Sequence, residues 1–98
     1  MSSLAVVLQE DRRGLILCTL DEASGFRLSD VSIRTILDNF GHRVSTDQVR
    51  GDLHWLAEQG LVRVEKVETH WLAELLNAGQ EVARGVSHPG VRKQAARR

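Results

Sequence analysis

The run between Ser45 and Glu65 constrains the fold more than any other part of the chain. Ser45 is followed three residues later by Gln48, the spacing of a capping box, in which both side chains satisfy free backbone N–H groups at a helix start. We therefore predict that a helix begins at about Thr46. Its apolar residues recur at the spacing of one helical face and comprise Val49, Leu53, Leu56 and Ala57. Gly60 supplies the left-handed conformation that ends a helix.

The residues after this glycine alternate between apolar and charged. Val62 and Val64 point to one side of an extended chain, and Arg63 and Glu65 point to the other, which is typical of a half-buried strand. A capped helix, a glycine stop and a strand in this order predict the hinge of a winged-helix domain.

The residues before this run predict the first half of such a domain. Apolar residues indicate a helix from about residue 3 to 22, and Gly14 leaves open two shorter helices that meet near Asp11. The alternating residues 26–28 predict a short strand that joins the wing sheet. Ser29 then caps a further helix, the first of the helix-turn-helix pair.

The residues after it predict the second half. Residues 71–75 alternate as a second wing strand, and Asn77 with Gln80 repeats the capping-box spacing before a short closing helix. The predicted fold class is mainly α with a small β-wing, in the order helix, strand, helix, helix, strand, strand, helix. We expect a winged-helix domain over residues 1–86 and a flexible basic tail over residues 87–98.

Size and composition limit the classes of function. A chain of 98 residues with 42% apolar residues buries one core, which leaves little room for a catalytic cleft. We expect no enzymatic activity and no cofactor. The sequence offers no membrane span and no secretory signal, so we expect the cytoplasm of a bacterial host cell. Cys18 is alone and the four histidines are scattered, so we expect no metal site; they are His42, His54, His70 and His88.

The net charge of zero conceals an uneven distribution. Residues 1–91 contain nine Lys and Arg against thirteen Asp and Glu, a balance of −4, and the last seven residues carry the other four positive charges. An acidic body binds duplex DNA weakly on its own, because affinity for DNA comes largely from neutralising phosphates. The tail either contacts phosphate or serves as a solubilising end. Its basic residues are Arg92, Lys93, Arg97 and Arg98.

A longer motif, V-R-x-D-L-x-W-L-x-E-x-G-L-V over residues 49–62, suggests a family. Together with residues 11–13, 25–28, 41–45 and Trp71, it makes the chain up to residue 85 resemble small proteins of Mu-like transposable phages and prophages. That family is described as ArsR-like winged-helix regulators, and its members occur near DNA-packaging and morphogenesis genes. The resemblance therefore implies either regulation or assembly. The wing tip at residues 68–70 is shorter than the family's Asp-Gly-type turn.

The winged-helix interpretation predicts a DNA-reading surface. The helix over residues 46–59 would lie in the major groove, and Arg50 could contact guanine O6 and N7, a contact that discriminates by ~1–3 kcal/mol. Asp47 and Glu58 argue against this surface, because carboxylates repel phosphate. The predicted DNA contacts are Arg43, Ser45, Thr46, Asp47, Gln48, Arg50, Gly51 and His54, with Lys66, Thr69 and His70 from the wing.

Two hypotheses about function follow. In the first, the protein is a phage or prophage transcriptional regulator that binds double-stranded DNA as a homodimer. In the second, the winged helix is a protein-interaction module in phage assembly or DNA packaging and binds another phage protein without specific DNA binding. Trp55 packs on the first helix or Trp71, or else joins an interface whose candidate residues are Leu4, Val7, Leu8 and Trp55. Asp52 is expected to pair internally with Arg63 or Arg34.

Overall fold

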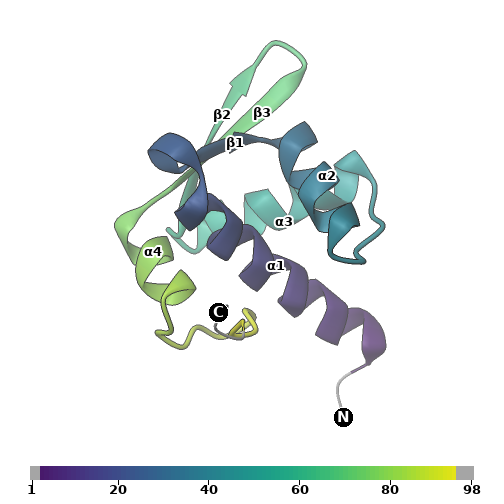
Figure 1. Cartoon of the computed structure of the whole chain (residues 1–98), viewed down its shortest axis with the longest axis vertical. Coiled ribbons are helices and arrows are strands. Elements are labelled where there is room, and N and C mark those ends of the chain that lie inside the picture. The colour runs from purple at the N-terminus through teal and green to yellow at the C-terminus, as the bar shows by residue number, and fades with distance from the viewer. Residues whose placement is uncertain (1–2, 95–98) are drawn as a thin grey trace.

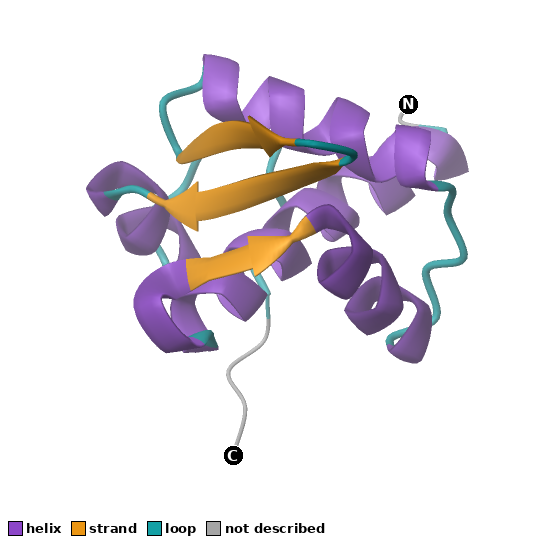
Figure 2. Cartoon of the chain, turned by 90° about the horizontal axis from the view of Figure 1, so that it is seen from above, coloured by secondary structure: helices purple, strands orange, loops and turns teal. Residues whose placement is uncertain are grey.

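A computed structural model describes residues 3–94 and shows four α-helices and a small antiparallel sheet (Figures 1 and 2). The sheet has the strand order β1-β3-β2, so β3 lies in the middle. This confirms the predicted succession of helices and strands, with one short 3-10 turn added. The elements are α1 (Leu4–Glu22), η1 (Ser24–Phe26), β1 (Arg27–Ser29), α2 (Asp30–Asn39), α3 (Thr46–Glu58), β2 (Val62–Val67), β3 (His70–Leu75) and α4 (Asn77–Ala83).

The start and end of α3 follow from its local sequence. The Ser45 side chain accepts a hydrogen bond from the Gln48 N–H, and the Gln48 side chain accepts one from the Ser45 N–H, which confirms the predicted capping box. Gly60 has a φ of 74°, the left-handed conformation that lets the chain leave the helix for β2. Local signals therefore place the boundaries of α3 where the sequence predicted them.

The predictions for the two outer helices have different outcomes. α1 is one continuous helix, so the chain does not take the alternative of two shorter helices. In α4 the predicted capping box at Asn77 is wrong, because Leu76 occupies the cap position and makes no side-chain hydrogen bond there. The Gln80 amide instead donates to the Asp21 carboxylate at 3.0 Å and so connects α4 to the end of α1.

The core lies between the helices and one face of the sheet. Val64 stands opposite Ala73 in the β2–β3 ladder and Leu28 stands opposite Ala73 from β1, so apolar side chains of all three strands occupy the same face. The helices contribute most of the buried residues. The core comprises Leu15, Ile16, Leu17, Leu20, Ile33, Leu37, Val49, Leu53, Leu56, Leu61, Val62, Ala73 and Leu75.

The C-terminal strap, residues 87–94, differs from the flexible tail that we expected after residue 86. Pro89 and Gly90 occupy the centre of a turn in which the Val91 N–H donates to the His88 carbonyl at 3.2 Å, and Gly90 has a φ of 85°. Proline followed by glycine with a positive φ is typical of a type II turn. The turn returns the chain to α1, where the Arg92 N–H donates to the Glu10 carbonyl at 3.1 Å.

Gly14 explains why the strap can lie against α1. A Cβ atom at Gly14 would overlap the carbonyl oxygen of Arg92, so only glycine permits this approach. The strap also lies against α3, because Gly90 packs on the Trp55 ring and accepts a hydrogen bond from Arg13 at 3.1 Å. The domain therefore includes the strap. Arg97 and Arg98, which were predicted to contact phosphate, lie outside the described residues.

Candidate nucleic-acid interface

The outer face of α3 is open to solvent. Asp47, Gly51, His54 and Glu58 are exposed, while Val49 and the leucines of the helix face the core. His54 lies 3.5 Å from Glu58, one helical turn away. The orientation that the sequence predicted for α3 is therefore observed, although this face carries two carboxylates.

Arg50 is engaged within the chain and is not free to contact a base as we predicted. Its Nε donates to the Asp30 carboxylate at 2.7 Å, and its Nη2 donates to the Thr69 carbonyl at 2.6 Å. The Asp30 side chain has no solvent exposure and the Arg50 side chain is 29% exposed. The guanidinium group therefore spans from α3 to α2 and to the β2–β3 turn, within one subunit.

The energetics oppose a contact between Arg50 and guanine. Burial alone would raise the pKa of Asp30, but hydrogen bonds from Arg50 and from the N–H groups of Trp71 and Val31 together lower it. Asp30 is thus a buried carboxylate that depends on its partners. Removing one partner of such a pair costs about 3–5 kcal/mol, whereas a guanine contact discriminates by about 1–3 kcal/mol. Moving Arg50 from Asp30 to a base would therefore cost more than a contact with guanine provides.

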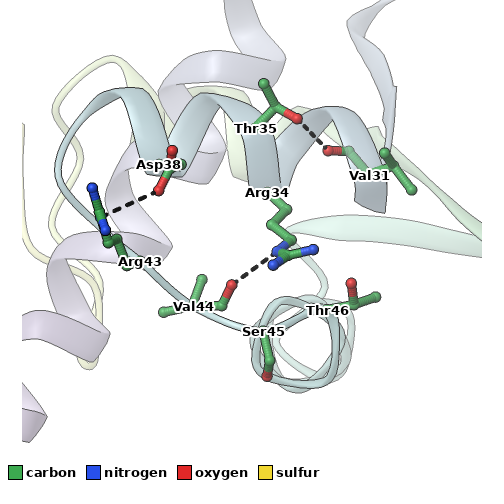
Figure 3. Close-up of a pocket in the computed structure, with 8 residues that line it drawn as sticks. All are labelled: Val31, Arg34, Thr35, Asp38, Arg43, Val44, Ser45 and Thr46. Atoms are coloured by element: carbon green, nitrogen blue, oxygen red, sulfur yellow. Dashed lines mark hydrogen bonds and ion pairs between the residues drawn. The ribbon is translucent and has the colours of Figure 1, made fainter.

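A cleft of about 610 Å³ lies between α2 and the start of α3 (Figure 3). The Arg34 side chain crosses from α2 toward α3, and its Nε donates to the Val44 carbonyl at 3.0 Å. Among residues 3–94, no carboxylate pairs with this arginine. Arg43 is almost fully exposed, and its Nε lies 3.8 Å from Asp38. The cleft is lined by Val31, Arg34, Thr35, Asp38, Arg43, Val44, Ser45 and Thr46.

Three of the predicted DNA contacts line this cleft, and one further residue was missed. Arg43, Ser45 and Thr46 were predicted, whereas Arg34 was considered only as a partner for Asp52. The signal for Arg34 was its place in α2, one position after the buried Ile33 and therefore off the core face. Ser45 and Gln48 cap α3, so their side chains are already engaged.

The β2–β3 hairpin carries the residues predicted for the wing. The Lys66 ammonium lies 4.9 Å from the centre of the Trp71 ring, and Thr69 and His70 are exposed at the turn. Glu68 has a φ of 55°, a conformation that costs energy for a residue other than glycine. The hairpin therefore presents basic and acidic side chains together.

The predicted interface residues separate into two groups. Leu4 is 72% exposed and Leu8 is exposed near it in the first turns of α1, whereas Val7 is only partly exposed. Trp55 lies beneath the strap, with the Arg13 guanidinium 3.8 Å from its ring centre, so it packs on α1 and not on Trp71. It is therefore part of the packing of this subunit.

Other charged residues pair within the chain. Asp52 has the internal role that we predicted, but its partners are Arg12 at 2.8 Å and Arg13 at 3.8 Å instead of Arg63 or Arg34. Arg63 pairs with Glu74 on the outer face of the sheet. On the strap, Arg92 and Lys93 are exposed.

The described residues contain neither a cluster of metal-ligating side chains nor a membrane-spanning helix. Over residues 3–94, no group of three or more His, Cys, Asp or Glu side chains is arranged to hold a metal ion. In the same part of the chain, no helix combines the length and the apolar surface that crossing a bilayer requires.

Comparison with known proteins identifies relatives in a phage and in a bacterium. No family model matches the chain. The chain is 42% identical over 79 residues to the uncharacterized protein gp26 of Escherichia phage Mu, a match that covers 81% of each chain. It is 36% identical over 70 residues to an uncharacterized protein of Haemophilus influenzae, a match that covers 71% of this chain and 68% of the relative. The chain therefore belongs to the family of phage Mu gp26.

Proposed function

We propose that α2, α3 and the β2–β3 hairpin form a winged helix that binds duplex DNA, and that the protein regulates transcription in a phage or prophage. The α2–α3 cleft at the start of the exposed helix α3 carries this proposal. Arg34 and Arg43 approach the first turn of α3, where backbone N–H groups and the helix dipole favour an anion. A DNA phosphate group satisfies both kinds of donor.

With Arg50 held by Asp30, recognition of bases falls to other side chains of α3. Gly51 allows close approach of the backbone to a groove, and His54 can donate to or accept from a base edge. Asp47 can accept a hydrogen bond from cytosine N4. We expect modest affinity, because the two carboxylates of this face oppose phosphate, and a salt dependence set by the number of phosphates that basic side chains neutralise.

A binding titration of the full chain tests the proposal. The duplex is the DNA upstream of the gene, the competitor is an unrelated duplex, and the measurement is made at about 50 and about 200 mM salt. Replacing Arg34 and Arg43 with Gln should reduce the slope of log affinity against log salt by about two. The control replaces Arg27 and Arg63 with Gln, which removes the same charge from the outer face of the sheet.

The exposed start of α1 favours a second candidate function, in which the protein binds a second copy of itself or another phage protein. Leu4, Val6 and Leu8 are exposed, and no charged residue interrupts residues 4–9. An uncharged apolar surface suits an interface with an equally uncharged copy. We expect light scattering to give the mass of a dimer, and the pair Leu4→Ser and Leu8→Ser to give a monomer. Val67→Ser, at an exposed valine of the hairpin, is the control.

A further inference from the structure

The Arg50 bridge consists of Arg50, Asp30 and Thr69, and it joins three elements that are separate in sequence. Arg50 lies in the second turn of α3, Asp30 begins α2, and Thr69 lies in the turn between β2 and β3. The distances from the Arg50 side chain are 2.7 Å to the Asp30 carboxylate and 2.6 Å to the Thr69 carbonyl. A single side chain therefore connects the helix pair to the tip of the hairpin.

The Asp30 side chain is itself held firmly. It accepts hydrogen bonds from the Val31 N–H at 2.9 Å and from the N–H of Trp71, and it is fully buried. Because Asp30 is held at the start of β3, it fixes the direction of the Arg50 side chain. The Trp71 ring further restricts the Arg50 guanidinium, which lies 5.4 Å from the ring centre, and the Lys66 ammonium lies 4.9 Å from the same centre.

The tip of the hairpin has few other contacts with the domain. Residues 65–70 are all exposed, and β1 pairs with β3 only at Leu72, Ala73 and Glu74, so the tip of the hairpin has two strands, an arrangement that is marginally stable without packing. The hydrogen bond from Arg50 to the Thr69 carbonyl therefore carries much of the connection between the tip and α3.

We infer that Arg50 is a positioning residue that holds the β2–β3 hairpin at a fixed place relative to α3, so that the two elements meet a duplex as one rigid surface. This inference rests on the proposed function for its ligand, but the bridge itself is a property of the free protein. If α3 and the hairpin are held rigidly, they recognise the shape and groove spacing of DNA, and Arg50 makes no contact with a base.

Arg50→Lys tests this inference, because lysine keeps the positive charge beside Asp30 but lacks the planar guanidinium group that reaches both acceptors. The control is Arg63→Lys, which changes an exposed pair with Glu74 on the opposite face of the same hairpin. The first measurement is amide hydrogen exchange of the full chain. We expect exchange in residues 66–71 to accelerate at least about tenfold in Arg50→Lys only, with the helix amides unchanged.

The second measurement is binding to the upstream and unrelated duplexes. We expect Arg50→Lys to weaken binding to both by the same factor, whereas a base-reading arginine would change their ratio. Unchanged exchange in residues 66–71 would overturn the inference, and so would a change in that ratio. If the unaltered protein binds no duplex but the variant still loosens the hairpin, the positioning role stands and the proposed function fails.

Discussion

For Gly14→Ala, a free tail and a packed strap predict opposite changes in the free energy of unfolding. In the interior of a helix, alanine is more favourable than glycine by about 1 kcal/mol. If residues 87–94 were free, Gly14→Ala would therefore stabilise α1. In the structure, a Cβ atom at this position overlaps the backbone carbonyl of Arg92. Because the overlapping atom belongs to the backbone, rotation of a side chain cannot relieve the overlap.

The strap must move away from α1 to accept the alanine. That movement breaks the hydrogen bond from Arg92 to Glu10 and the one from Arg13 to Gly90, each of which contributes about 0.5–1.5 kcal/mol. Part of the packing of Val91 against the core is lost as well. These losses exceed the helix gain, so we expect the free energy of unfolding to fall by about 1–3 kcal/mol.

Urea denaturation followed by circular dichroism measures this effect. Gly51→Ala is the control, because Gly51 lies in α3 with no atom within 4 Å of the added Cβ, and we expect about 0.5–1 kcal/mol of stabilisation. A chain truncated after Val86 lacks the strap, and in it Gly14→Ala should become stabilising. A stabilising Gly14→Ala in the full chain would refute the packed strap.

Three further predictions concern stability. Glu68→Gly should raise the free energy of unfolding by about 1 kcal/mol, because glycine adopts a φ of 55° without steric cost; a lower or unchanged urea midpoint would contradict this. The folded-state pKa of Asp30 is lowered, so its stabilising contribution is present above its ordinary pKa of 3.8 and is lost as the pH falls through the folded value. Acid titrations should therefore show a shallower loss of stability below about pH 4 in Asp30→Asn than in the unaltered chain. Trp55→Ala should accelerate amide exchange in the strap, since the Trp55 ring supports Gly90; protection equal to that of the unaltered chain would count against this contact.

The boundaries of α3 could be predicted because the signals that set them are local. Ser45, Gln48 and Gly60 act on backbone groups within a few residues, so the sequence alone contains the relevant chemistry. The same holds for the alternation of β2 and β3, which predicts the face of each side chain.

The partners of charged groups could not be predicted in the same way. Asp30 is 20 residues from Arg50, and nothing in either local sequence selects one arginine over another. Pro89 and Gly90 form a turn in the structure, but whether the chain then leaves the domain or returns to it depends on the surface that Gly14 leaves open on α1. These outcomes depend on tertiary packing, so they also change which residues are free to contact DNA.

The most direct test of the DNA-binding proposal is a map of the surface that a duplex touches. Amide chemical shifts of the full chain, recorded as the upstream duplex is added, report each contacted residue. Our account predicts that the largest changes fall on the first two turns of α3, on Arg34 and Arg43 of the cleft, and on the hairpin turn at residues 68–70. Changes confined to the start of α1 around Leu4 and Leu8, or no changes at all, would contradict it.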